Sequence, residues 1–119
     1  MVGDIYNLID EIVAFRDARD WSQFHTLKNL AASLSIEAAE LLELTQWKSE
    51  EELELALKDE DFCSKLSDET ADVLIYVLLI CKKAGIDPLD AARQKLVRNE
   101  KRYLLDKSRG SAKKYTEIE

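Results

Sequence analysis

Glycine and proline are scarce in this sequence of 119 residues, which has three glycines and one proline. Tight turns depend on both residues, so a turn-rich all-β fold is excluded. The chain also has a single histidine and two cysteines, and its longest apolar run has nine residues, from Val73 to Cys81. A membrane-spanning helix needs about 20 apolar residues, so we expect none in this sequence.

Helix-forming residues dominate what is present, since Ala, Leu, Glu, Lys and Asp are the most frequent, and they predict an all-α fold. Cys63 and Cys81 stand in helix-like sequence and form no metal or redox motif. They are typical of reduced core thiols in a cytoplasmic protein, and no signal-peptide pattern follows Met1. We expect one domain over residues 1–119, with a basic, flexible tail over residues 106–119.

The charge is unevenly distributed along the chain, whose formal net charge is −7. Residues 1–92 carry 20 acidic and 8 basic side chains, whereas residues 93–119 carry 4 acidic and 9 basic ones. The acidic body argues against general nucleic-acid binding. The basic end leaves a local phosphate site open, although a solvated helix face explains such charge equally well.

Apolar spacing and capping residues predict five helices. The first is expected over residues 4–19 and the second over 27–47, with an aromatic loop at 20–26 between them. Ser49 and Glu52 form a capping box that opens a short helix to about residue 58, followed by a solvated connection at 59–61. The fourth helix is expected over 63–84, ended by Gly85, and the fifth over 88–105, after Asp87 as its cap.

Two acidic pairs stand inside apolar helical sequence, Glu37 with Glu40 and Glu69 with Asp72. A spacing of three places both acids of a pair on one face of a helix. Two such helices face to face would gather four carboxylates, which raise one another's pKa values unless a cation lies among them. Single Glu-x-x-Glu pairs are common on solvated faces. The second pair is more informative, because nine apolar residues follow it and Asp is a poor helix-interior residue.

The residue types available narrow the choice of metal. Oxygen-only ligation suits a hard ion, Mg²⁺ with Mn²⁺ as a possibility, and such sites usually handle phosphate. A di-iron bundle needs Glu-x-x-His pairs on two helices, and the single histidine, His25, lies outside both acidic helices. A zinc site is excluded as well, because the two acidic motifs contain none of the His and Cys ligands that zinc needs.

The spacing of these motifs, Glu-x-x-Glu, 28 residues and then Glu-x-x-Asp, resembles that of the MazG-type all-α nucleoside triphosphate pyrophosphohydrolases. Residues 19–26, 40–48, 72–76 and 113–117, together with Asn99, resemble the same family. The similarity extends from about residue 13 to residue 117. It implies a four-helix-bundle core with a short extra helix, assembled as a homo-dimer or homo-tetramer.

The resemblance also implies an activity, the hydrolysis of a nucleoside triphosphate to the monophosphate and pyrophosphate, with dCTP or a modified cytosine deoxynucleotide favoured. No nucleic-acid or membrane partner is implied. The metal ligands implied for Mg²⁺ are Glu37, Glu40, Glu69 and Asp72, of which Glu37 and Glu40 are candidates for orienting the attacking water. The substrate-binding residues implied are Trp21, Phe24, His25, Trp47, Lys48, Tyr76, Asn99, Arg109 and Lys113.

The implied pocket residues also have ordinary structural explanations. Trp21 and Trp47 suit a subunit interface, Tyr76 suits a core position with its hydroxyl satisfied, and His25 suits a helix cap. Two other functions stay open. One is the same fold with a broad or different base preference, and the other is a non-enzymatic helical partner module. Intact acids on both helices argue against the module.

Overall fold

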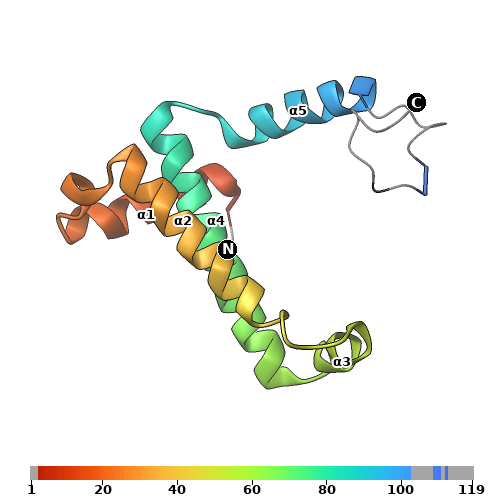
Figure 1. Cartoon of the computed structure of the whole chain (residues 1–119). Coiled ribbons are helices and arrows are strands. Elements are labelled where there is room, and N and C mark those ends of the chain that lie inside the picture. Colours follow the sequence, from red (N-terminus) through yellow and green to blue (C-terminus); the bar gives the residue numbers. More distant parts are fainter. Residues whose placement is uncertain (1–2, 103–108, 111, 113–119) are drawn as a thin grey trace. The chain divides into compact units, whose positions relative to one another are not determined.

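The computed structural model describes residues 3–102, 109, 110 and 112, and the all-α class predicted from the sequence is confirmed (Figure 1). Its elements are α1 (Ile5–Ala18), the 3₁₀ turn η1 (Ser22–Phe24), α2 (Leu27–Glu43), α3 (Glu50–Ala56), α4 (Glu60–Ala84) and α5 (Pro88–Arg102). No strand occurs among the described residues, and none of the described helices is long and apolar enough to cross a membrane. The chain divides into two compact units at Ile86.

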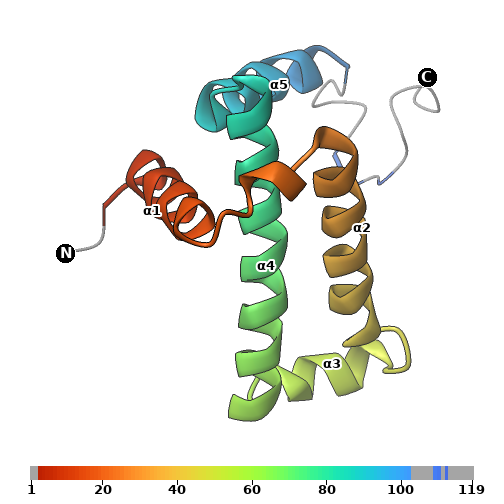
Figure 2. The same cartoon turned by 90° about the vertical axis from the view of Figure 1, so that its left-hand side faces the viewer.

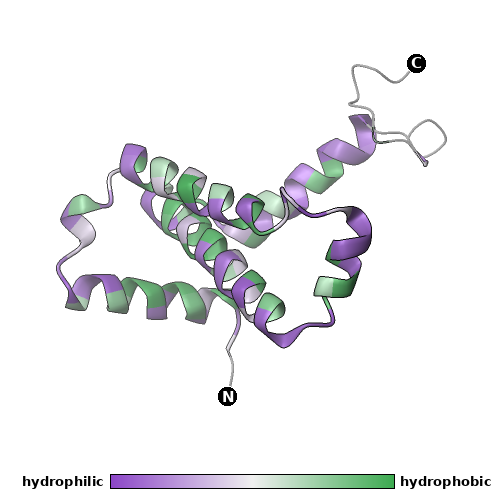
Figure 3. Ribbon diagram, turned by 60° about the horizontal axis from the view of Figure 1, so that its bottom comes forward, coloured by the Kyte–Doolittle hydropathy of each residue, from purple (hydrophilic) through white to green (hydrophobic). Residues whose placement is uncertain are grey.

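The first unit is built on α2 and α4, which run antiparallel and side by side (Figure 2). The short helix α3 joins their ends, and α1 packs against α4. Apolar and polar residues alternate around α1, α2 and α4, as expected for helices that bury one face (Figure 3). Among the described residues, the buried core consists of Leu30, Leu78, Leu79 and Cys81.

Side-chain caps fix where the helices of this unit begin. Asp4 accepts hydrogen bonds from the backbone N–H groups of Tyr6 and Asn7, and Thr26 Oγ1 accepts one from Asn29 at 3.1 Å. Both hydrogen bonds of the predicted capping box between Ser49 and Glu52 are present. Each cap satisfies backbone donors that the first turn of a helix leaves unpaired.

Two predicted boundaries were wrong. Residues 59–61 do not form a solvated connection: Asp59 caps α4 by accepting from Phe62 N–H at 3.0 Å, and Glu60 and Asp61 form the first helical turn. Negative side chains stabilise that end of a helix dipole. The second helix ends at Glu43 rather than at Trp47, because the chain tightens into turns in which Thr45 Oγ1 donates to the carbonyl of Leu42.

The second unit contains α5, which begins with the predicted arrangement of Asp87 as cap and Pro88 as the first helical residue. Asp87 Oδ1 accepts from the N–H groups of Leu89 and Asp90 at 3.1 and 3.2 Å. Proline suits this position because its missing N–H would have no helical partner there. The predicted end of this helix, residues 103–105, lies outside the described residues.

Candidate functional site

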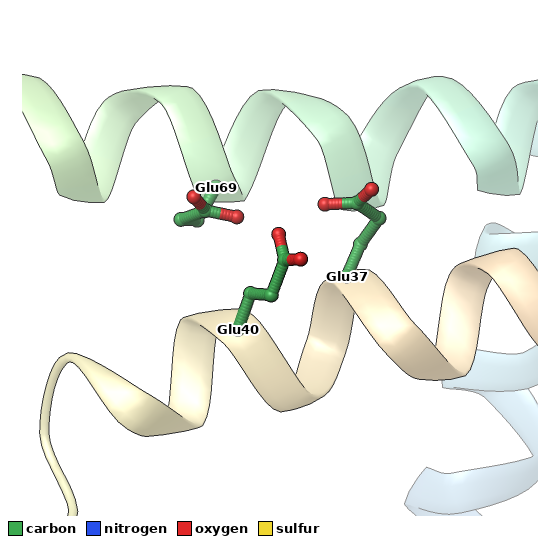
Figure 4. Close-up of side chains that lie close together, drawn as sticks. All are labelled: Glu37, Glu40 and Glu69. Carbon is green, nitrogen blue, oxygen red and sulfur yellow. The ribbon is translucent and has the colours of Figure 1, made fainter.

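Three acidic side chains meet where α2 faces α4. Glu37 and Glu40 come from successive turns of α2, and Glu69 comes from α4 (Figure 4). One carboxylate oxygen from each lies within 4.8 Å of the others. The helical spacing of three and the antiparallel pairing of the two helices therefore bring together the first predicted acidic pair and Glu69 of the second pair.

The protonation of this cluster shows how strongly its members interact. Burial, a hydrogen bond with Glu40 and the charges of Glu40, Asp72 and Glu69 raise the pKa of Glu37 to about 7. Burial and the proximity of Glu40 also raise the pKa of Glu69. Buried like charges favour proton uptake, so without a cation Glu37 holds its proton well above the usual carboxylate range.

Asp72 stands beside the cluster and not within the group of three. Its charge raises the pKa values of Glu37 and Glu69, although its oxygens fall outside the 4.8 Å set. Asp72 also lines a pocket on the α1 side of α4. Asp72 is therefore the residue that both lines this pocket and acts electrostatically on the acidic cluster.

The donor set fits a hard divalent cation. Glu37 Oε2 and Glu69 Oε2 are buried without a hydrogen-bond partner, which is costly for a carboxylate oxygen. A cation would satisfy both oxygens and remove the repulsion that raises their pKa values. Oxygen-only ligands are those that Mg²⁺ and Mn²⁺ prefer.

The neighbouring pocket has a volume of about 250 Å³ and is mainly apolar and aromatic. Ligand pockets for drug-sized molecules span about 300 to 1,000 Å³, so this one suits a single ring system. Three of the predicted substrate-binding residues, Trp21, His25 and Tyr76, line it. The remaining lining residues are Ile12, Phe15, Arg16, Asp72, Ile75 and Leu79.

The aromatic wall of the pocket is braced from α1. The rings of Phe15 and Trp21 meet edge to face, with centroids 5.7 Å apart. The guanidinium of Arg19 lies 3.7 Å from the Phe15 ring centroid and 5.9 Å from that of Trp21, and its Nη1 donates to the Phe15 carbonyl at 2.9 Å. Cation–π attraction and the hydrogen bond hold Arg19 against both rings and so restrict their orientation.

His25 supplies a polar atom to the pocket. Its Nδ1 is buried and has no hydrogen-bond partner among the described residues. Burial and the positive charge of Arg16 lower the pKa of the imidazole, so the neutral form dominates at pH 7. A neutral imidazole offers one donor and one acceptor to a ligand. The predicted helix-cap role falls to Thr26 instead.

Of the other predicted substrate-binding residues, Phe24, Trp47 and Lys48 do not line this pocket. Trp47 is 86% exposed, Phe24 is also exposed, and neither lines the pocket. Lys48 lines a second hollow of about 390 Å³ with Glu43, Asp59, Asp61 and Lys65, among others. Asn99 and Arg109 belong to the second unit, and Lys113 lies outside the described residues. Their roles stay predictions.

The comparison with known families agrees with this arrangement, since a model of the MazG-like family matches residues 32–118. The chain belongs to the MazG-like family. The curated relatives include proteins named dCTP pyrophosphatase 1 from Mus musculus and Homo sapiens, 39% and 36% identical over 104 residues. Each match covers 87% of this chain but only 61% of the relative's length.

A solved relative shows the same fold. The crystal structure of a pyrophosphatase from Archaeoglobus fulgidus superposes with a TM-score of 0.79 at 42% sequence identity. The match covers 87% of this chain and 95% of that one. The all-α MazG-like architecture is therefore established for most of the chain.

Three residues of α1 line the pocket, Ile12, Phe15 and Arg16, and none of them is among the substrate-binding residues predicted from the sequence. Ile12 belongs to the apolar stripe of the helix, which gives no sequence signal that separates a pocket from a core. The apolar positions Ile5, Ile9 and Ile12 place residue 16 on the same face of the helix. A cation on that stripe was the available signal, because burying a guanidinium requires a reason.

Proposed function

We propose that this chain is a Mg²⁺-dependent nucleoside triphosphate pyrophosphohydrolase. Its proposed substrate is dCTP or a modified cytosine deoxynucleoside triphosphate, which it converts to the monophosphate and pyrophosphate. The observation that carries the proposal is the position of Asp72, which lines the aromatic pocket and acts electrostatically on the acidic cluster. A base in the pocket would therefore place its phosphates toward the carboxylates.

The relatives support the choice of substrate class. The curated matches are named dCTP pyrophosphatase 1, and the solved one is titled a pyrophosphatase. The chain spans about 61% of the length of those curated relatives, so the activity is proposed for this chain and not transferred with the name. The cytoplasm is the proposed compartment, because deoxynucleotide pools and reduced thiols such as Cys63 and Cys81 belong there.

The acidic cluster would contribute charge and geometry to the reaction. Glu37, Glu40 and Glu69 would hold the cation, and Asp72, whose charge acts on Glu37 and Glu69, is proposed as a fourth ligand. Bound there, Mg²⁺ would neutralise phosphate charge and make a nearby water a better nucleophile. Four carboxylates without a cation would repel a triphosphate, so we expect substrate and metal to bind together.

Proton removal from the attacking water falls to a carboxylate of α2. Glu40 is exposed at the centre of the cluster and Glu37 is partly buried behind it, so either oxygen pair can orient a water. A general base needs only hydrogen-bond reach of the proton that it accepts. The neutral His25 and the hydroxyl of Tyr76 would meanwhile fix the base in the pocket.

A panel of nucleotides tests the proposal. Purified protein is incubated with each canonical, 5-methylated and oxidised deoxynucleoside triphosphate and Mg²⁺, with EDTA as the metal-free control. Separation of the products by ion exchange distinguishes monophosphate plus pyrophosphate from diphosphate plus phosphate. We expect dCMP and pyrophosphate from dCTP, and no product with EDTA.

Two alternatives give different results in the same panel. Comparable turnover of several bases would favour a broad or different base preference on the same fold, which is a known freedom of such scaffolds. No turnover of any nucleotide at any divalent metal would refute the enzyme and favour a non-enzymatic helical partner module.

A further inference from the structure

We propose that Arg16 is a specificity-determining residue that reads the acceptor edge of a cytosine base, N3 and O2, inside the aromatic pocket. The proposal rests on the proposed function, which supplies the nucleotide, and adds the residue that selects the base.

The position of Arg16 is unusual for an arginine. Its side chain is only 17% exposed, and it lines the pocket formed by Trp21, His25 and Tyr76. Arginine is rarely buried unless its charge is paired. A largely buried guanidinium that lines a pocket is a candidate for ligand contact where some of its donors are left without a partner.

The hydrogen bonds of Arg16 leave its outer nitrogens available. Nε donates to Asp17 Oδ1 at 2.9 Å, an ion pair at the rim, since the Asp17 side chain is 54% exposed. Within the part of the chain that the structure describes, Nη1 and Nη2 of Arg16 make no ion pair or hydrogen bond, and Asp72 across the pocket is not paired with it. These two nitrogens form the planar fork that suits two adjacent acceptors.

The identity of the base follows from where such acceptor pairs occur. Cytosine presents N3 and O2 as neighbouring acceptors, and guanine presents O6 and N7. Thymine and uracil carry a hydrogen on N3, and adenine places an amino group beside its acceptor. A fork of donors therefore favours cytosine or guanine over the other bases, and the volume of about 250 Å³ favours the single ring of cytosine.

The surroundings of Arg16 agree with this role. Phe15, Trp21 and Tyr76 line the pocket, and aromatic side chains are the residues on which a flat base stacks. The imidazole of His25 is kept neutral beside the guanidinium, so it adds no second positive charge to the pocket, which Asp72 also lines. The ion pair with Asp17 balances the charge of Arg16 and leaves its outer donors for a base carbonyl.

The test removes the donors and keeps an unbranched, flexible side chain. We measure kcat/KM of the wild type and of Arg16→Met for dCTP, dUTP and 3-deaza-dCTP, which lacks the N3 acceptor. A good bidentate contact is worth a factor of about 5 to 150 in base discrimination. We expect Arg16→Met to lose that factor on dCTP, mainly through KM, and to change by no more than about twofold on dUTP.

The deaza substrate localises the contact. The wild type should already be slower on 3-deaza-dCTP than on dCTP, and Arg16→Met should lose less on the deaza substrate than on dCTP, because one shared hydrogen bond cannot be lost twice. Arg16→Lys keeps the charge but not the fork. If Arg16→Lys retains the full dCTP-to-dUTP ratio, charge alone suffices and the reading of two acceptors is wrong.

Arg19→Met is the matched control, since Arg19 ends the same helix and braces the wall from outside the pocket. It should leave the dCTP-to-dUTP ratio within about twofold of the wild type even where it lowers both rates. An equal loss on all nucleotides in Arg16→Met would overturn the proposal, because it would mark a phosphate contact or a damaged fold.

A binding measurement separates this proposal from the proposed function. Calorimetric titration of dCMP and dUMP in EDTA needs neither metal nor turnover. The wild type should bind dCMP more tightly than dUMP, and Arg16→Met should bind both equally. If the wild type hydrolyses nothing yet shows this difference, the enzyme is refuted and the base-reading role stands. Equal binding of dCMP and dUMP by the wild type refutes the role of Arg16 alone.

Discussion

The carboxyl groups of Glu37 and Glu40 lie one turn apart on α2 and interact directly. Burial of Glu37, together with the hydrogen bond and the charge that Glu40 supplies, raises the pKa of Glu37 to about 7. Glu40 also acts on Glu69 across the helix pair, so it is the central member of the cluster. A cation and protons therefore compete for the same oxygens.

The raised pKa of Glu37 predicts how stability depends on pH without metal. In EDTA the folded chain keeps a proton on Glu37 up to about pH 7, whereas the unfolded chain releases it near its ordinary pKa of 4.5. This contribution to stability is fully present below pH 4.5 and is lost as the pH rises through 7. We expect Glu37→Gln to gain melting temperature relative to the wild type as the pH rises from 4.5 to 8.

Glu52→Gln is the control for that series. The cap hydrogen bonds from Ser49 lower the pKa of Glu52, so its contribution is present above the ordinary value and is lost only in acid. Its melting temperature should differ from the wild type by a constant amount above about pH 5. A Glu37→Gln difference that is equally constant would contradict the coupling within the cluster.

Removing the central carboxylate should separate activity from stability. We expect Glu40→Gln to abolish turnover and to leave the metal-free melting temperature unchanged or slightly raised, because one like charge leaves a crowded site. Glu43→Gln, one turn further along α2 and outside the cluster, should keep its activity. A large loss of metal-free stability in Glu40→Gln would show that Glu40 is structural.

Addition of a divalent metal should stabilise the wild type much more than Glu40→Gln. A cation that binds only the folded chain raises stability by about 2.7 kcal/mol at a hundred times its Kd. We expect Mg²⁺ or Mn²⁺ to raise the melting temperature of the wild type by differential scanning fluorimetry, and Glu40→Gln to lose most of that rise. An equal rise in both proteins would place the cation elsewhere.

Local chemistry explains why so much of the fold could be predicted. Ser49, Gly85 and the Asp87–Pro88 pair each leave a sequence signal at a helix end, and each acts there as expected. The prediction of a solvated connection at residues 59–61 was wrong because acidic side chains are typical both of such connections and of the first turn of a helix. Only the bond from Phe62 N–H to Asp59 distinguishes the two.

The site could be predicted in part, because helical spacing fixes which acids share a face but not which helices meet. Glu37, Glu40 and Glu69 converge as expected. Whether Asp72 also reaches the cluster depends on how far α2 and α4 are shifted along each other, which the sequence does not determine. Trp47 and Tyr76 have similar sequence surroundings as aromatics near the acidic motifs. Trp47 is exposed and Tyr76 lines the pocket, because the burial of an aromatic side chain depends on which residues pack against it in the folded chain.

The end of α4 makes a separate prediction about backbone strain. Gly85 has φ +69° and ψ +32°, a left-handed conformation that lets Ile86 N–H donate to Cys81 at 2.9 Å. A Cβ at Gly85 would meet nothing within 4 Å, so substitution costs backbone energy alone. We expect Gly85→Ala to lose about 1 kcal/mol in urea unfolding, and Gly85→Asn to lose less. Equal stability of Gly85→Ala and the wild type would refute this explanation.

The small core of the first unit predicts self-association. Only four described residues are buried, whereas Ile36, Leu42, Leu74 and Val77 on α2 and α4 are exposed large apolar side chains. Full burial of such a side chain is worth about 1.5 to 3 kcal/mol, and a second copy of the chain would supply part of it. We therefore expect a homo-dimer or homo-tetramer by sedimentation, with a melting temperature that rises with protein concentration.

Two variants separate an interface from a core defect. Leu42→Gln and Leu74→Gln change side chains that are exposed in the single chain, so they should shift the sedimentation toward the monomer and weaken the dependence of melting temperature on concentration. Leu30→Ala removes a buried side chain and should cost about 2 to 5 kcal/mol at every concentration without weakening that dependence. A wild type that sediments as a monomer at high concentration would refute the association, because the apolar faces of α2 and α4 would then stay in water.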